Sequence, residues 1–218
     1  MEAEWDGFKY LVEDEPIQWH INNGLSEPYP RELALVKKYL EKYPSNHICI
    51  DVGGHVGLTA LPYSRLFQKV IAFEPNPVSH HFFKHNIALN HNENITLYHK
   101  GVYNKTMKCS LTKHGNNSGC YYIKESEQGI DTIRLDDMEF DSPVDFIKID
   151  TEGSELYVLE GAYDLLVKDK PLINIETNGN SNHFFGYDKE KIVEFLKSLE
   201  YKVWDDDGNN PLYYGKIE

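Results

Sequence analysis

A glycine-rich segment, Asp51-Val52-Gly53-Gly54-His55-Val56-Gly57, follows the apolar run Ile48-Cys49-Ile50 and precedes a stretch that can form a helix. Glycine loses more backbone entropy on folding than any other residue, so three glycines in five positions need a reason. At a strand-to-helix junction the usual reason is a ligand that approaches the backbone closely. Glu74 ends the next apolar run, where a carboxylate can accept hydrogen bonds from both ribose hydroxyls. We therefore expect a ligand that contains a nucleoside.

The glycine spacing favours one nucleoside over another. The dinucleotide fingerprint has glycines at the first, third and sixth positions of G-x-G-x-x-G. Counting from Gly53, the third position holds His55 and the sixth holds Leu58. Asp51 beside the loop would repel a diphosphate and attract a cation. S-adenosylmethionine carries a sulfonium, an ammonium and a ribose but no phosphate. The segment therefore predicts S-adenosylmethionine rather than NAD.

A second strand-to-helix junction repeats this pattern. Asp150 ends the run "DFIKID", Gly153 permits a turn, and Glu152 and Glu155 lie near the start of a predicted helix, where its dipole favours negative charge. Glu176 ends the neighbouring run "PLINIE". In parallel sheets ligands bind beyond the carboxyl ends of the strands, so these acids are expected to meet at one edge.

Two catalytic arrangements follow for a hydroxyl substrate. In the first, Asp150 or His183 is a general base and no metal is needed. In the second, Asp150, Glu176 and Asn178 hold Mg²⁺ or another divalent ion, which lowers the pKa of the hydroxyl. The asparagine-rich segment after Glu176 suits hydrogen bonding to a polyhydroxylated acceptor, but an ordinary turn explains it equally well.

The elements that must position these residues alternate between strands and helices. Short apolar runs end at Asp51, Glu74, Asp150 and Glu176, and helical spacing lies between them. This alternation predicts an α/β fold with a mostly parallel sheet covered on both faces. Helices are expected over residues 57–67, 77–90, 154–167 and 189–199, with one from Arg31 onward, a hairpin around residues 114–119, and two closing strands after residue 200.

Composition narrows the function classes. The 218 residues carry a net charge of -13 and lack a dense basic cluster, so we expect no nucleic-acid partner. No apolar run approaches the ~20 residues of a membrane span. The acidic N-terminus does not resemble a secretory signal, and three cysteines without Cys-x-x-Cys spacing indicate neither a disulfide framework nor a zinc site. A cytoplasmic location is the expectation.

Five segments together resemble the FkbM-type methyltransferases, a branch of the class I S-adenosylmethionine-dependent fold. They are "IDVGGHVGLTA", "VIAFEPNP", "TIRLDDM", "VDFIKIDTEGSELYVLEGA" and "PLINIE". The resemblance runs from about Ile48 to Glu176. It implies a Rossmann-like, seven-stranded sheet with an antiparallel last strand in a methyltransferase domain over residues 46–218. Residues 1–45 are then an N-terminal extension that packs, through its helix, on the core.

The resemblance also implies O-methylation of a hydroxyl on a sugar, a glycan or a related polyol. By position, the loop residues line the methionine end, Glu74 holds the ribose, and Val102 lies near the adenine. His55 departs from the pattern, because the family usually has asparagine there. The implied cofactor-binding set is Asp51, Gly53, Gly54, His55, Gly57, Thr59, Glu74, Pro75, Asn76, Val102 and Asp150.

Two other functions stay open at this point. One is an NAD-dependent oxidoreductase that modifies nucleotide sugars, which the loop spacing disfavours. The other is a non-catalytic binding module that keeps the methyltransferase fold. The chain could also be a domain of a larger glycan-synthesising protein.

Overall fold

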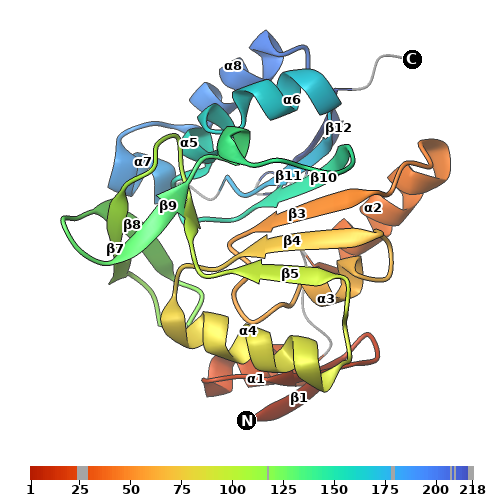
Figure 1. Ribbon diagram of the computed structural model, residues 1–218, viewed down its shortest axis with the longest axis vertical. Helices are drawn as coiled ribbons and strands as arrows, with labels where there is room; N and C mark the ends of the chain where they lie inside the picture. The colour runs from red at the N-terminus through yellow and green to blue at the C-terminus, as the bar shows by residue number, and fades with distance from the viewer. Residues whose placement is uncertain (24–28, 117, 178–179, 207, 209, 216–218) are drawn as a thin grey trace.

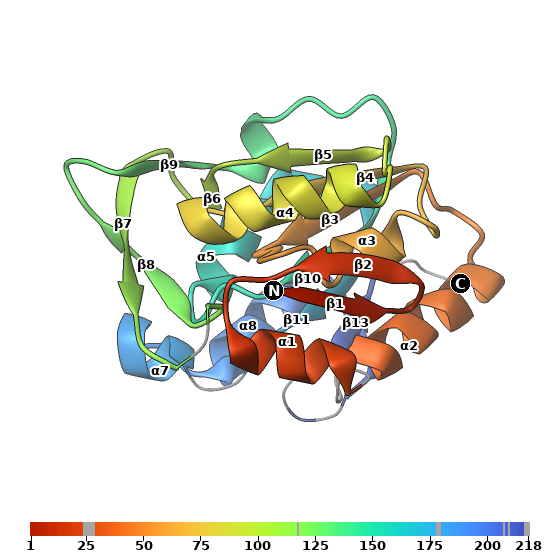
Figure 2. The ribbon, with the colours of Figure 1, turned by 90° about the horizontal axis from the view of Figure 1, so that it is seen from below.

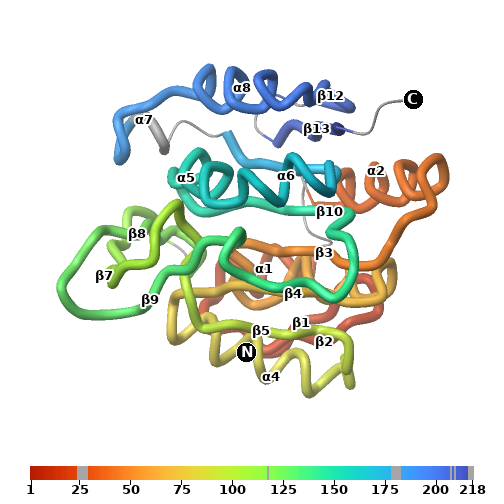
Figure 3. Tube along the Cα trace, turned by 45° about the horizontal axis from the view of Figure 1, so that its top comes forward, coloured from red at the N-terminus to blue at the C-terminus, as the bar shows by residue number. Residues whose placement is uncertain are grey.

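The computed structural model describes residues 1–23, 29–116, 118–177, 180–206, 208 and 210–215. At its centre lies a seven-stranded sheet in the order β12-β13-β11-β10-β3-β4-β5, which can be followed from top to bottom in Figure 3. The strands are β3 (Ile48–Val52), β4 (Lys69–Phe73), β5 (Ile95–Tyr98), β10 (Val144–Ile149), β11 (Leu172–Ile175), β12 (Lys202–Asp205) and β13 (Leu212–Tyr214).

The sheet is parallel apart from its last strand. β13 pairs antiparallel with both β11 and β12, while β10 pairs parallel with β3 and β11, and β4 with β3 and β5. The predicted α/β fold with an antiparallel last strand is confirmed. β3 and β10 are buried along their whole length, as strands covered on both faces must be.

Helices cover the two faces and complete two apolar clusters. On one face α2, α3 and α4 pack around Val36, Tyr63 and Phe83. On the other, α5, α6 and α8 pack around Val158, Leu166 and Ile192. The helices are α2 (Tyr29–Lys42), α3 (Ala60–Tyr63), α4 (Pro77–Leu89), α5 (Glu155–Glu160), α6 (Tyr163–Asp169) and α8 (Lys189–Ser198).

Two of these helices differ from the sequence-based expectation. α3 has four residues, because residues 53–59 form the glycine loop instead of an early helical turn. The helix expected over residues 154–167 is broken between α5 and α6 at Gly161. A Cβ at Gly161 would overlap the carbonyl oxygen of Tyr103, so the chain turns where another segment presses against it.

The N-terminal residues form a hairpin and a helix before α2. β1 (Glu2–Trp5) pairs antiparallel with β2 (Phe8–Leu11). The helix α1 (Glu15–Asn22) is capped by Asp14, whose side chain accepts a hydrogen bond from the Ile17 amide at 2.9 Å. This unit packs on the glycine loop, because Val56 and Leu58 belong to its apolar cluster. Figure 2 shows the hairpin and α1 next to each other.

A second, four-stranded sheet lies past the carboxyl ends of β3 and β4, at the left of Figure 1, and is called the roof below. Its order is β6-β9-β7-β8, and β7 and β8 form the predicted hairpin, with Lys113 opposite Tyr121. Beside it lies α7 (Asn180–Phe185), in a segment read from sequence as a loop. The remaining elements are β6 (Gly101–Val102), β7 (Lys108–Lys113), β8 (Tyr121–Glu125), β9 (Ile130–Ile133) and the 3-10 turn η1 (Leu135–Asp137).

Within the described part of the chain, no helix combines the length and the hydropathy that crossing a bilayer requires.

Candidate functional site

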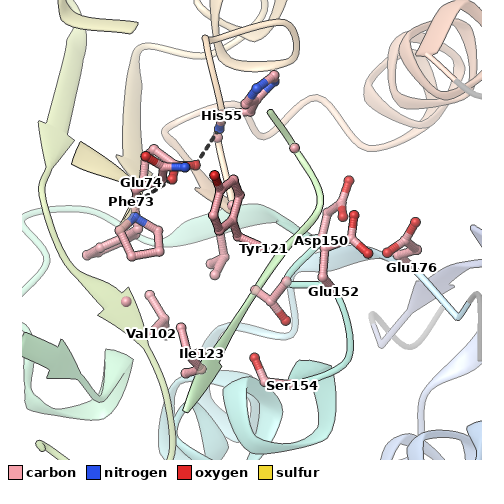
Figure 4. Close-up of a pocket in the computed structure, with 18 of the residues that line it drawn as sticks. His55, Phe73, Glu74, Val102, Tyr121, Ile123, Asp150, Glu152, Ser154 and Glu176 are labelled. Atoms are coloured by element: carbon pink, nitrogen blue, oxygen red, sulfur yellow. Dashed lines mark hydrogen bonds between the residues drawn. The ribbon is translucent and has the colours of Figure 1, made fainter. Parts of the chain in front are cut away.

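A cavity of about 200 Å³ lies between the roof and the carboxyl ends of β3, β4, β10 and β11. It is where a parallel sheet is expected to bind its ligand. Figure 4 shows Glu74 and His55 on one side of it, a group of carboxylates on the other, and Tyr121 between them. Ten predicted site residues line it: Gly53, Gly54, His55, Thr59, Glu74, Pro75, Asn76, Val102, Asp150 and Glu176.

The glycines of the loop serve the chain's own packing as well as the cavity. Gly53 has φ +85°, and a Cβ there would overlap the carbonyl oxygen of Asp150. Gly57 has φ +92°, and a Cβ there would come within 2.6 Å of the Phe83 ring. Both positions thus require glycine even without a ligand. Gly53 borders the cavity, whereas Gly57 faces α4 and is not part of the lining.

Glu74 fixes the loop through both of its carboxylate oxygens. Oε2 accepts a hydrogen bond from the His55 amide at 2.7 Å, and Oε1 accepts one from the Asn76 amide at 2.6 Å. The side chain is 6% exposed, and burial raises its pKa to about 8. Each carboxylate oxygen has a second lone pair, so Glu74 can still accept hydrogen bonds from ligand hydroxyls.

His55 connects the glycine loop to the roof and to the N-terminal unit. Its Nε2 lies 2.7 Å from the Ser118 hydroxyl, and the Ser118 amide donates to Asp14 Oδ2 at 2.7 Å. Burial lowers the pKa of His55 to about 4, so the ring is neutral at pH 7. Its φ is +48°, a left-handed conformation that histidine and asparagine both adopt more readily than most residues. Histidine at position 55, where the resembling family usually has asparagine, therefore allows the same backbone conformation and adds the contact to Ser118.

The side of the cavity next to Glu74 is apolar. Val102, Phe73 and Ile123 line it and are almost entirely buried. Gly101 also lines it, and a Cβ there would lie 3.2 Å from the Thr132 side chain, so this glycine allows close packing within the roof. A planar, weakly polar ring is the ligand that such a wall accommodates best.

On the opposite side, Asp150, Glu152 and Glu176 present carboxylate oxygens within 4.8 Å of one another. The register of β10 and β11 pairs Ile149 with Ile175, so the next residues, Asp150 and Glu176, are neighbours. Glu152 joins them from the following turn, with φ +58°. The three carboxylates therefore meet because β10 pairs with β11 and because Glu152 has a left-handed backbone conformation.

A buried lysine sets the charge of this cluster. Lys148 Nζ lies 3.0 Å from Asp150 Oδ2, and Lys148 is 4% exposed. Burial opposes charge on Asp150, yet the Lys148 ammonium holds the Asp150 pKa below its usual value. Burial and the Asp150 charge raise the Glu176 pKa well above its usual value. Asp150 is thus ionised at neutral pH, and Glu176 keeps its proton to a higher pH than an ordinary glutamic acid does.

Asp51 stands behind the cavity and outside its lining. It is fully buried, and the Thr59 hydroxyl donates to its Oδ2 at 2.7 Å. Asp51 pairs with Lys148 across β3 and β10, and both Thr59 and Lys148 reach the cavity. Asp51 therefore supports two lining residues.

Two predicted residues remain, His183 and Asn178. His183 is exposed on α7 and contributes nothing to the cavity lining. Asn178 lies outside the described residues, so the predicted metal set is represented by Asp150 and Glu176, which Glu152 joins.

Several lining residues escaped the sequence reasoning. Ile17 and Tyr29 come from the region read as an extension, and Ser118 and Cys120 come from the polar loop of the roof. Tertiary packing alone brings these distant segments to the cavity. Lys148 carried a usable signal, because a lysine inside the apolar run "DFIKID" must find a buried acid.

Comparison with known proteins matches residues 51–203 to the model of the methyltransferase FkbM domain. "Methyltransferase 1" of Beauveria bassiana (strain ARSEF 2860) is 25% identical over 164 residues, which span 62% of this chain and 66% of that protein. The chain thus covers slightly less than two thirds of this relative.

Solved structures share the fold. The methyltransferase FkbM structure from Methylobacillus flagellatus KT has a TM-score of 0.55 and 21% identity over 78% of this chain and 43% of its own. A Streptococcus mutans methyltransferase in complex with SAH has a TM-score of 0.56 and 11% identity over 87% of this chain and 98% of its own.

Proposed function

The chain belongs to the FkbM methyltransferase family, and from this we propose that it is an S-adenosylmethionine-dependent O-methyltransferase acting on a hydroxyl of a sugar, a glycan or a related polyol. One observation carries the proposal. A single cavity has a hydrogen-bond acceptor for a ribose beside an apolar wall on one side and an ionised carboxylate on the other.

The residues that line the cavity suit S-adenosylmethionine. Glu74 would hold the ribose hydroxyls, and Val102 and Phe73 would enclose the adenine. The methionine end, which carries positive charge, would lie near Gly53 and the carboxylates, where no phosphate-binding cation projects from the loop. When bound, S-adenosylmethionine supplies an electrophilic methyl group to a nucleophilic oxygen. The Streptococcus mutans protein of the same fold, solved with SAH, supports this choice of cofactor.

The acceptor is proposed to bind at Asp150 and Glu176. An ionised carboxylate next to a protonated one offers an acceptor and a donor, which is the combination that neighbouring sugar hydroxyls require. Phe184 is not part of the cavity lining, and one face of its ring stacks on Tyr122 with 4.1 Å between ring centroids. We therefore assign acceptor recognition to the carboxylates.

Asp150 is proposed to accept the proton of the acceptor hydroxyl. Lys148 keeps Asp150 ionised and oriented, and a positioned base of this kind typically contributes 10²–10⁴-fold in rate. Aligning the hydroxyl with the methyl group supplies the rest of the rate enhancement, because displacement at carbon requires an in-line approach. His183 is less suited to this role, because it is exposed on α7.

A metal-assisted form of the same reaction has its own supporting observation. Asp150, Glu152 and Glu176 together offer three oxygen ligands, the type that Mg²⁺ prefers. Glu176 Oε2 is buried and accepts no hydrogen bond among the described residues. In this form the ion would lower the pKa of the acceptor hydroxyl.

A panel of acceptors tests the proposal. The protein is incubated with S-adenosylmethionine and monosaccharides, glycosides or cyclic polyols, with Mg²⁺ or with EDTA, and SAH release is measured. We expect SAH release above the acceptor-free rate with at least one polyol and a methyl ether as product. N-methylated or C-methylated products alone would contradict it. Loss of turnover in EDTA that Mg²⁺ restores would select the metal-assisted form.

A further inference from the structure

Three side chains of different ligand type converge where the roof meets the edge of the central sheet. An imidazole nitrogen of His114, the sulfur of Cys120 and a carboxylate oxygen of Glu152 all lie within 4.8 Å of one another. His114 Nε2 is 3.1 Å from Glu152 Oε2. A thiol, an imidazole and a carboxylate form a mixed donor set, which differs from the all-oxygen set of Asp150, Glu152 and Glu176.

The fold places two of these donors on the roof hairpin. Lys113 pairs with Tyr121 across β7 and β8, so His114 and Cys120 are the next opposed residues, joined by a hydrogen bond from the His114 amide to the Cys120 carbonyl at 3.1 Å. Directly opposed residues of an antiparallel pair project from the same face. A Cβ at Gly115 would overlap the Cys120 side chain, so glycine at 115 leaves room for the thiol.

Glu152 supplies the third donor from the other side of the cavity. It lies in the turn between β10 and α5, with φ +58°, and is followed by Gly153 with φ +121°. Glu152 and Cys120 both line the cavity. The three donors therefore join the roof to the edge of the central sheet across the cavity mouth.

This donor set matches the coordination chemistry of zinc. Zn²⁺ binds thiolate sulfur at ~2.3 Å and imidazole nitrogen or carboxylate oxygen at ~2.0–2.2 Å in a tetrahedron, so its donor atoms lie roughly 3.3–3.8 Å apart. The observed separations need only small side-chain rotations to reach this geometry. Thiolate ligands select zinc over Mg²⁺ or Ca²⁺, which take oxygen ligands.

We propose that His114, Cys120 and Glu152 bind a Zn²⁺-type cation that fastens the roof over the cavity. Three protein ligands leave a fourth position for water or for a ligand oxygen at the cavity mouth. The ion would close the exit from the cavity and slow the escape of a molecule bound beneath the roof. The absence of Cys-x-x-Cys spacing does not argue against this site, because the donors come from two separate segments.

Cobalt provides a spectroscopic test. Metal-free protein is titrated with Co²⁺, whose bond to a thiolate gives a near-ultraviolet charge-transfer band. We expect one Co²⁺ per chain, a charge-transfer band, and displacement by Zn²⁺ but not by Mg²⁺. Cys120→Ser should abolish the band, and His114→Ala should weaken Co²⁺ binding by more than the ~10–100-fold that loss of an outer-shell partner costs.

Matched variants separate this site from the rest of the chain. Cys109→Ala removes a buried thiol of the same hairpin, and His85→Ala removes an exposed imidazole of α4, and neither should change the titration. Glu176→Gln should leave the band in place, because Glu176 belongs to the oxygen cluster. A band that survives Cys120→Ser, or one that disappears with Glu176→Gln alone, would overturn the proposal.

Alkylation of the wild-type protein covers the case in which a variant fails to fold. Zn²⁺ should slow iodoacetamide labelling of Cys120, measured by peptide mass spectrometry, while Mg²⁺ should not. Labelling at the same rate with and without Zn²⁺ would refute the site. SAH binding in EDTA reports separately on the proposed function, so failure of either proposal can be recognised without the other.

Discussion

Asp150 and Glu176 present carboxylate oxygens within 4.8 Å of each other at the ends of two neighbouring parallel strands, yet burial and charge move their pKa values in opposite directions. The pairing of β10 with β11 forces the two carboxyl groups together, and Lys148, at 3.0 Å from Asp150, determines which of them is ionised. Two neighbouring acids whose pKa values are moved apart in this way are typical of sites where proton transfer occurs.

The two acids should therefore respond differently to amide substitution. Asp150→Asn removes the carboxylate that forms the ion pair with the buried Lys148 ammonium, and we expect the free energy of unfolding to fall by about 1–3 kcal/mol at pH 7. Glu176→Gln replaces an acid whose raised pKa favours the neutral form by a neutral amide, and should change stability by less than about 1 kcal/mol. Urea denaturation of both variants measures the difference. A larger loss for Glu176→Gln than for Asp150→Asn would contradict this charge assignment.

Glu74 should control cofactor affinity. Glu74→Ala removes the acceptor proposed for the ribose and both hydrogen bonds that fix the loop at His55 and Asn76. An uncharged hydrogen bond contributes ~0.5–1.5 kcal/mol, so losing the two proposed bonds to the ribose hydroxyls should make SAH bind about 10–100-fold more weakly by calorimetry. Glu93→Ala, at an exposed position, is the control and should bind as the wild type does. Equal affinity in both variants would remove Glu74 from the cofactor site.

Glu74 should also make stability depend on pH. Its pKa is about 8 in the folded chain against an ordinary value of 4.5, so the native state holds a proton between these values that the unfolded chain has lost. The free energy of unfolding should therefore fall as the pH rises from about 4.5 to 8. Denaturation of the cofactor-free protein at pH 5, 6.5 and 8 measures the slope. Glu74→Gln should flatten it in part, because Glu176 shifts in the same direction. An unchanged slope would disprove the assignment.

Gly53 should be far more sensitive to substitution than another glycine of similar backbone. Gly53 and Gly186 have φ of +85° and +73°, but a Cβ at Gly53 would overlap the Asp150 carbonyl, whereas one at Gly186 has no atom within 4 Å. Gly186→Ala should cost only the left-handed strain of about 1–2 kcal/mol. We expect Gly53→Ala to cost at least about 3 kcal/mol and to weaken SAH binding, measured by melting with and without SAH. Similar losses in both variants would show that packing against Asp150 is unimportant.

Much of this arrangement could be predicted from local sequence. The strands that end in Asp51, Glu74, Asp150 and Glu176 were identifiable because a parallel sheet buries short apolar runs and leaves polar residues at their ends. Ten predicted residues consequently line the cavity. The side on which a terminal acid projects was not predictable, because it depends on register. Asp51 projects with Cys49 toward the α2 face, beside Lys148, and so stands behind the cavity.

The roof of the cavity could not be predicted in the same way. Ser118 and Cys120 lie in a polar loop without periodicity, and Tyr29 lies in a segment read as an extension. Their positions depend on contacts between segments far apart in sequence, such as the hydrogen bond from Ser118 to Asp14. Local pattern carries no information about such pairs, although the β7–β8 hairpin itself was recognisable from its flanking strands.

Ligand-dependent melting tests the central claim most directly. The protein is heated with SAH, with NAD or with neither, in EDTA. At 100 times its Kd, SAH should add ~2.7 kcal/mol of stability, a rise in Tm of roughly 5–10 °C for a chain of this size, and NAD should add nothing. A shift with NAD alone would contradict our interpretation of the glycine loop. No shift with SAH at saturating concentration would mean that the cavity does not bind the cofactor of this family.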